Sequence, residues 1–284
     1  MDDHSYRLGS TGVVLNPTDT SVLPFVDIVK VGGLDSAELR TTERDHEGVD
    51  GGFLDAEFEK MRTITFEGQI ITNHIGTESF LDRLKGDWAP RRTTIPLYFQ
   101  HPGIAERLIF VKPLGVKYDI DELRRVGSVD AQFMCQAENP SIFDSNLITL
   151  PINQGLSVAT GFGFPFGFPF GFGAAVDPTT TNAYNSGNRP ATAIFTIPGP
   201  VTNPRILSTT TGDELRFVID LAASDYLEID LYNRTVRLNG TASRRGSLLE
   251  PNWFMLEVGD NFLQYRADTA GNPPASVSYR NAWR

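Results

Sequence analysis

The side chains that most often do chemistry are few in this sequence and lie far apart. The histidines are His4, His46, His74 and His101. None has a partner at metal-ligand spacing, apart from the cluster Asp45–Glu47 around His46, which we interpret as solvated loop residues. The sequence has no HExxH, GxSxG or Walker motif, and no GxGxxG after a strand. We therefore predict no catalytic residues, no cofactor and no metal site.

The single cysteine, Cys135, excludes an internal disulfide and a cysteine-based metal cluster. It occupies one position of the alternating stretch AQFMCQ, and no basic residue is near it in the sequence to lower its pKa. A buried, unreactive thiol is therefore favoured over a nucleophile. Pairs of carboxylates could serve a glycosidase, but acidic residues are so frequent here that such pairs carry almost no information.

The composition is typical of a turn-rich β protein. The chain has 284 residues, 40% of them hydrophobic and 21% charged, which suits one large domain or two ordinary ones. The 35 acidic residues outnumber the 25 basic ones and give a net charge of -10. This balance argues against nucleic-acid binding as the main role, because phosphate binding needs clustered Lys and Arg. The polar, acidic first residues show no secretory signal, so we expect synthesis inside the cell.

The first half alternates short strands with Gly- and Pro-rich breaks. One helix is predicted over Thr77–Lys85, ended by Gly86. Glu43–Gly52 is charged and rich in Gly, and it is predicted to be an exposed loop, either a plain connector or a contact with a partner. Alternation predicts strands over Phe25–Val31, Met61–Phe66, Thr94–Phe99, Leu108–Lys112, Val116–Ile120 and Val129–Gln136.

The second half shows a cleaner period of two. Apolar residues alternate with polar ones along Leu215–Leu221 and Leu227–Leu231 and again from Thr235 to Leu238, which predicts a hairpin with one apolar and one solvated face. Arg237 would then pair across the strands with Glu228 or Asp230.

Turn signals and later strands complete a predicted antiparallel sandwich or jelly roll. Asn239-Gly240 is a strong turn signal. The two Asn-x-Thr matches, at Asn233 and Asn239, are interpreted as turn residues rather than glycosylation sites. Further strands are predicted over Trp253–Val258, Asn261–Ala267 and Ser276–Arg280.

The stretch GFGFPFGFPFGFG at Gly161–Gly173 places Phe at every second position. In an extended chain all these rings lie on one face. A membrane-spanning helix is disfavoured by the Gly and Pro content. A flexible linker, burial against protein and a membrane-active segment stay open, and we expect burial, without insertion into a membrane. The interface candidates are Phe162, Phe164, Phe166, Phe168, Phe170 and Phe172.

Several stretches, in order, cover nearly the whole chain and carry a family resemblance. The first half contributes Gly51-Gly52, RTITFEG, LDRLKGDWAP, IPLYF with Pro102-Gly103 behind it, and VDAQFMCQAENPSIFD. The second half contributes GPVTNPRI, TTTGDELRFVIDLAASDYLEIDLYNRTVRLNG and WFMLEVGDNFLQYRA. Together they resemble the distal tail proteins (Dit) of long, flexible-tailed bacteriophages. None is a catalytic fingerprint, so the specificity lies in their order.

The resemblance implies a mainly β fold in three parts. These are an N-terminal ring-forming β domain with one short helix (1–145), a Gly/Pro/Phe-rich connector (146–190) and a C-terminal galectin-like β-sandwich, or jelly roll (191–284). Galectin-type sugar binding is not implied, because the second half contains no histidine.

The resemblance also implies a structural virion protein of the tail tip. It predicts a hexameric ring in the baseplate hub that joins the tail tube to the adsorption apparatus. The expected partners are other copies, the tail tube protein and the tail-associated lysin or fibre hub protein. DNA would pass through the lumen without specific binding, and the excess negative charge predicts a neutral or acidic lumen.

Two other function classes remain as alternatives. One is a carbohydrate-binding β-sandwich module, in which Trp253 and Trp283 would stack on sugars, although Trp253 followed by Phe254 is more typical of a core. The other is a jelly-roll glycoside hydrolase, which needs two carboxylates at the right separation in one groove.

Overall fold

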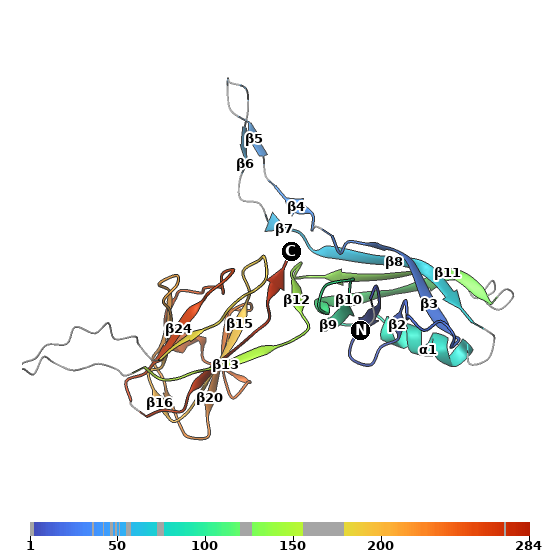
Figure 1. Ribbon diagram of the computed structural model, residues 1–284. Coiled ribbons are helices and arrows are strands. Elements are labelled where there is room, and N and C mark those ends of the chain that lie inside the picture. The colour runs from blue at the N-terminus through green and yellow to red at the C-terminus, as the bar shows by residue number, and fades with distance from the viewer. Residues whose placement is uncertain are drawn as a thin grey trace, which may run out of the picture. The chain divides into compact units, whose positions relative to one another are not determined.

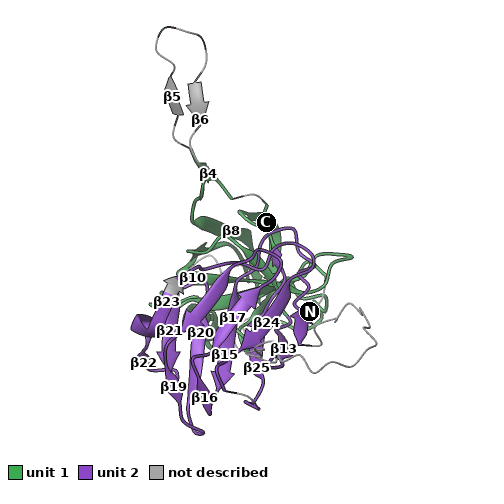
Figure 2. Cartoon of the chain, turned by 90° about the vertical axis from the view of Figure 1, so that its left-hand side faces the viewer, with its two compact units in different colours: residues 1–145, 283–284 green, residues 146–282 purple. Residues whose placement is uncertain are grey.

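The computed structural model describes residues 3–35, 37–41, 43–45, 48, 50, 52–54, 58–72, 77–119, 127–155, 179–269 and 271–284. The chain forms two compact units, one of residues 1–145 with 283–284 and one of residues 146–282 (Figure 2). The described residues are mainly strands, with one α-helix, so the predicted fold class is confirmed. No described helix is long and apolar enough to cross a membrane.

Unit 1 is a β-barrel (Figure 1). Its sheet runs in the order β11-β8-β3-β2-β1-β9-β10, and β10 also pairs with β11, which closes the circuit. β12 continues the sheet from β10, and β26 lies next to β12. The strands are β1 (Tyr6–Leu8), β2 (Val14–Leu15), β3 (Phe25–Gly32), β8 (Arg62–Ile71), β9 (Ile95–Phe99), β10 (Arg107–Tyr118), β11 (Ser128–Ala137), β12 (Ile142–Asp144) and β26 (Ala282–Trp283).

The core of unit 1 follows from the period of two along its strands. In β8 and β11 every second side chain is buried, including Phe66 and Phe133. Helix α1 (Thr77–Asp87) buries Leu81 and Leu84 in the same core. Trp88, directly after the helix, is only 1% exposed, and its ring centroid lies 5.9 Å from that of Phe66 and 5.1 Å from that of Phe133.

The helix is confirmed, but its predicted end at Gly86 is wrong. Gly86 lies inside α1, which continues to Asp87, and the Trp88 amide still donates to the Leu84 carbonyl at 3.1 Å. The Arg91 guanidinium donates to the Gly86 carbonyl at 2.8 Å and to the Asp87 carbonyl at 3.4 Å. A side chain thus satisfies the last carbonyls, so no left-handed glycine is needed.

Two strands that the sequence separates at Pro113 are one strand, β10. The register with β11 shifts between Pro113 and Gly115, so the proline lies at a β-bulge where a ladder amide is not required. Gly115 has a φ of 127°, which L side chains rarely adopt.

The predicted loop Glu43–Gly52 is strand at both ends. β5 (Glu43–Asp45) pairs with β6 (Gly52–Leu54), and β4 (Leu39–Arg40) pairs with β7 (Phe58–Glu59). A ladder of only two strands has no sheet face to bury, so no hydrophobic alternation marks it in the sequence. We call the insertion between β3 and β8, residues 34–61, the arm (Figure 1).

Unit 2 contains two antiparallel sheets, as predicted for a sandwich. The six-stranded sheet has the order β13-β25-β15-β20-β21-β22, and the five-stranded sheet has the order β14-β24-β17-β18-β23. Alternate side chains are fully buried, among them Phe195, Phe217 and Tyr265. The strands are β13 (Ile148–Ile152), β14 (Thr180–Asn182), β15 (Ala193–Pro198), β17 (Arg205–Ser208), β18 (Glu214–Phe217), β20 (Tyr226–Asp230), β21 (Thr235–Leu238), β22 (Ala242–Ser243), β23 (Leu248–Pro251), β24 (Phe262–Arg266) and β25 (Ala275–Tyr279), with a separate ladder of β16 (Val201–Thr202) and β19 (Asp220–Leu221).

Two strands lie inside the range 146–190 that the resemblance gave as a connector. β13 pairs with β25 and β14 pairs with β24, so both are strands of unit 2. The remaining part of that range from 156 to 178, with its six phenylalanines, lies outside the described residues.

The predicted hairpin of the second half is confirmed. β20 pairs with β21, and Arg237 lies directly opposite Glu228. Asn239 and Gly240 have φ values of 52° and 71°, which form the turn into β22. Asn233 also lies in a turn, where its side chain donates to Asp230 at 2.7 Å. The interpretation of both asparagines as turn residues is confirmed.

The prediction of a strand over Trp253–Val258 is wrong. Phe254 and Leu256 are buried and alternate with exposed Met255 and Glu257, as the pattern indicated. This extended segment makes only a single bridge, at Leu256, to Ala191. A period of two reports alternate burial, and a ladder additionally needs a neighbouring strand.

Candidate assembly surfaces

The outward face of β3, β8, β10 and β11 is hollowed, and its lining mixes charged, polar and apolar residues. A depression of about 1000 Å³ is lined by side chains from all four strands. Lys30 Nζ lies 3.4 Å from a Glu67 carboxylate oxygen, and the neutral Gln69 amide donates to the Asp130 carboxylate at 3.0 Å. Lys117 adds a further positive charge and Asp119 a further negative one. This face has no net excess of cations with which to hold a polyanion.

A β-bulge on β3 presents an apolar side chain beside this depression. The register between β3 and β8 shifts between Ile28 and Lys30, so Val29 is left out of the ladder and is 78% exposed. Gly68 of β8 faces the bulge, and a Cβ there would lie 2.0 Å from the Asp27 carbonyl oxygen. The two backbones therefore approach as closely as glycine permits.

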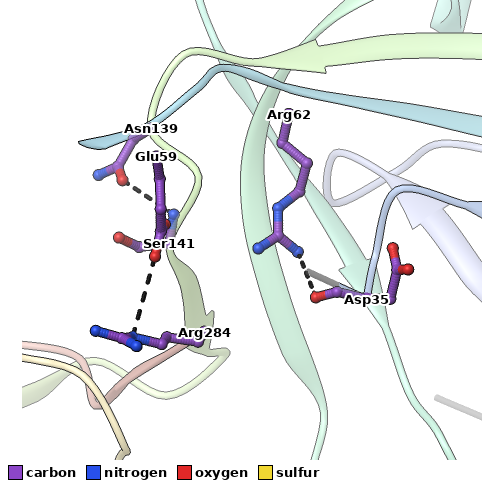
Figure 3. A network of polar contacts seen from close by, with 6 residues as sticks. All are labelled: Asp35, Glu59, Arg62, Asn139, Ser141 and Arg284. Atoms are coloured by element: carbon purple, nitrogen blue, oxygen red, sulfur yellow. Dashed lines mark hydrogen bonds and ion pairs between the residues drawn. The ribbon is translucent and has the colours of Figure 1, made fainter. Parts of the chain in front are cut away.

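The base of the arm is held by a buried arginine (Figure 3). Arg62, the first residue of β8, is 4% exposed, and it donates to the carbonyls of Leu34 at 3.2 Å and Asp35 at 3.3 Å. Gly33 turns the chain into the arm with a φ of 84°, at a point where a Cβ would lie 2.0 Å from the Thr63 carbonyl oxygen. Both ends of the arm are thus fixed to the barrel.

The described part of the arm carries exposed apolar groups. Leu39 is 49% exposed, while Phe58 and Met61 are each 57% exposed. The Arg40 guanidinium lies 5.5 Å from the centre of the Phe58 ring. Protruding apolar side chains of this kind are typical of a surface that another protein covers.

The chain returns to unit 1 at Trp283 and Arg284. The Arg107 guanidinium carbon lies 3.9 Å from the centre of the Trp283 ring, and Trp283 Nε1 donates to Asp144 at 2.8 Å. Burial lowers the pKa of Arg107, and the nearby Asp144 carboxylate offsets part of that effect. Arg284 Nε lies 4.0 Å from a carboxylate oxygen of Glu59 in the arm (Figure 3).

The structure brings together two histidines that the sequence separates. The ring centroids of His4 and His101 are 5.9 Å apart, and the Tyr6 hydroxyl lies 3.5 Å from His101 Nε2. These side chains line a second depression of about 730 Å³ beside β3. The pKa of His101 is lowered by burial and further by His4 and Arg107. No signal in the sequence placed the two imidazoles together, because the contact depends on the pairing of β1 with β9.

The potentially reactive side chains lie as follows. Cys135 is fully buried, so its predicted burial is confirmed, and burial raises its pKa to about 12, which favours the unreactive protonated thiol. Among the described residues no group of three His, Cys, Asp or Glu side chains could hold a metal ion. His46, His74 and the six interface phenylalanines lie outside the described residues.

Each tryptophan named for sugar stacking is half-buried and has an arginine near its ring in the described structure. Trp283 is covered by Arg107. Trp253 is half-buried, and Arg245 lies 5.8 Å from its ring centre. Other aromatic side chains of unit 2 are more exposed than these two tryptophans, including Tyr184, Tyr232 and Phe262.

Comparison with known proteins gives a consistent result for both units. The sequence model of the siphovirus-type tail component, C-terminal domain, matches residues 186–283. The Dit protein of phage SPP1, described as a paradigm of the hub adsorption apparatus in phages that infect Gram-positive bacteria, has 12% sequence identity and a TM-score of 0.65 over 100% of both chains. No curated protein matches the chain in sequence.

Chains of the phage p2 baseplate in its activated conformation are also similar in fold. The structure with calcium aligns over 99% of this chain and 98% of that one, with 12% identity and a TM-score of 0.54. The structure with strontium aligns over 98% of both chains, with 12% identity and a TM-score of 0.53. The likeness therefore extends through both units.

Proposed function

We propose that copies of this chain form the ring of a phage distal tail. The premise is that the chain belongs to the siphovirus-type tail component family through its C-terminal domain. The chain is a structural component of the virion, in the baseplate hub at the tail tip. The observation that carries this function is the family match over residues 186–283, and the likeness in fold extends over the whole chain.

In this proposal unit 1 forms the ring and unit 2 forms the outer sandwich, which includes β13 and β14 from the range 146–190. The ring is hexameric and joins the tail tube protein to the tail-associated lysin or fibre hub protein. Identical copies that meet through two different surfaces either close into a ring or continue as a filament. Unit 1 offers the protruding arm, with exposed Leu39 and Phe58, as a surface for one such contact.

We further propose that the polar face of β3, β8, β10 and β11 lines the lumen. Its cations are matched by nearby carboxylates, such as Glu67 beside Lys30, so DNA would slide past without releasing counterions. The expected result is no DNA binding by the assembled ring in fluorescence anisotropy at physiological salt. Salt-sensitive binding at that ionic strength would contradict this assignment.

The Gly–Phe stretch at Gly161–Gly173 is proposed to be covered by a neighbouring copy in the ring. Burying a Phe side chain contributes ~1.5–3 kcal/mol, which is comparable to the ~1–2 kcal/mol that ordering each residue costs. The triple variant Phe164→Ser, Phe166→Ser, Phe168→Ser should therefore weaken assembly more than it lowers either unit's melting temperature. A triple variant that assembles like the parent would support the linker interpretation instead.

The ring itself is tested by native mass spectrometry with negative-stain electron microscopy of the purified chain. We expect a closed hexamer, formed alone or on addition of the neighbouring tail proteins. A strictly monomeric mass at high concentration, with no ring even in the presence of those proteins, would refute the proposal.

A further inference from the structure

The last described strand contributes to unit 1 although the residues before it belong to unit 2. Unit 2 extends to Ala282, whereas Trp283 and Arg284 belong to unit 1. β26 lies next to β12, the strand after which the chain leaves unit 1. The two places where the chain passes between the units are thus neighbouring strands of one sheet.

Trp283 is fixed in place by two independent interactions. The guanidinium of Arg107 lies 3.9 Å from the centre of its ring, within the range of a cation–π contact, and its indole N–H donates to Asp144 at 2.8 Å. Arg107 and Asp144 are themselves directly opposite each other in the pairing of β10 with β12. Trp283 therefore contacts both members of this oppositely charged pair at the end of the barrel sheet.

Arg284 extends this anchor to the arm. Its Nε atom lies 4.0 Å from a Glu59 carboxylate oxygen, and the Glu59 side chain is only 17% exposed. Glu59 belongs to β7, which pairs with β4, and the next residue, Lys60, donates its amide to the Glu38 carbonyl at 2.7 Å. Because the Arg284 side chain is 74% exposed and the separation is 4.0 Å, this ion pair is weak alone, and Trp283, the residue before Arg284 in the chain, is the firmly held part of the anchor.

We infer that Trp283 and Arg284 are positioning residues that fasten the base of the arm to the barrel. Arg62 holds the start of the arm from inside the barrel, and Trp283 with Arg284 holds its return strand from the barrel end. The consequence for assembly rests on the proposed function, in which the arm contacts a neighbouring copy. A fastened arm presents its apolar side chains in one orientation and loses less conformational entropy when that copy binds.

The test is hydrogen exchange of the full chain, read at the Lys60 amide and at the amides of β4 and β7. Trp283→Ala should speed their exchange roughly tenfold, because losing a hydrogen bond and a cation–π contact shifts an opening equilibrium by about that factor. Exchange in the middle of β8 should not change. Trp283→Phe, which keeps an aromatic ring but loses the indole N–H, should have an intermediate effect.

A matched control is Trp253→Ala, which removes a tryptophan near an arginine in unit 2 without touching the arm. Unchanged arm exchange in Trp283→Ala, or equal acceleration in Trp253→Ala, would overturn the inference. Oligomer mass is measured in parallel. Faster arm exchange with a weaker ring supports both the fastening and its role in assembly. Faster arm exchange with an unchanged ring supports the fastening and refutes the arm as a ring contact.

Discussion

Replacing Trp88 by Ala should destabilise unit 1 and leave unit 2 unchanged. The side chain is 1% exposed, and its ring packs against Phe66 and Phe133 at centroid separations of 5.9 and 5.1 Å. It joins the residues after α1 to both β8 and β11. Truncating a buried Trp typically costs ~3–5 kcal/mol of unfolding free energy. This truncation also removes two contacts between aromatic rings, which the remaining cavity does not replace.

The expected magnitude follows from the size of the unit. For a domain of this size ~1 kcal/mol corresponds to roughly 2–4 °C, so the melting temperature of unit 1 should fall by about 6–20 °C. Differential scanning calorimetry resolves this loss if the two units melt separately, and urea unfolding followed by fluorescence checks it. Trp253→Ala is the control, because Trp253 is half-buried and lies in unit 2.

A loss of less than ~1 kcal/mol in Trp88→Ala would mean that the site collapses onto the cavity and that the aromatic cluster does not hold unit 1 together. An equal loss in the transition of unit 2 would mean that the units do not fold as separate cores. Either result would refute the account of unit 1 as a barrel with its own core.

Three further predictions concern single side chains. Because the pKa of His101 is lowered from 6.5, its contribution to the free energy of unfolding is present above pH 6.5 and is lost as the pH falls through its folded value; urea titrations between about pH 7.5 and 5.5 should show this decline, and His101→Gln should reduce it. Burial raises the pKa of Cys135 to about 12, so iodoacetamide at about pH 8 should label it only after unfolding, and rapid labelling of the native chain would contradict its burial. Gly68→Ala should destabilise by ~1–3 kcal/mol in urea, since its Cβ would lie 2.0 Å from the Asp27 carbonyl oxygen, whereas Gly246→Ala, with nothing within 4 Å, should have little effect.

The strands that the sequence predicts best are those with one buried and one solvated face. Along β20 and β21 the alternation of Leu227 and Ile229 with Glu228 defines both the strand and the face. The same reasoning divided β10 at Pro113, because a bulge that tolerates proline depends on the partner strand. A period of two in the sequence indicates which side chains are buried. Whether a strand continues without a break depends on its partner strand, which the local sequence does not show.

The candidate surfaces were less predictable because they depend on contacts between distant residues. His4 meets His101 through the pairing of β1 with β9, and Trp283 meets Arg107 through the placement of β26 next to β12. Local spacing contains neither contact. Within the arm only Glu43–Gly52 was predicted from the sequence, as a charged and exposed loop, because two-stranded ladders bury no face that a period of two could reveal.

The family match over residues 186–283 and the exposed apolar residues of unit 1 favour the same structural role in an assembly. In unit 1 the exposed apolar side chains include Leu39 and Phe58 on the arm and Val29, which lines the hollowed sheet face together with charged residues. Exposed apolar groups on the arm, such as Leu39 and Phe58, suit a subunit that other copies of the chain cover. The fastening of the arm by Trp283 then has a physical purpose, because a protrusion can specify one ring geometry only if its base is rigid.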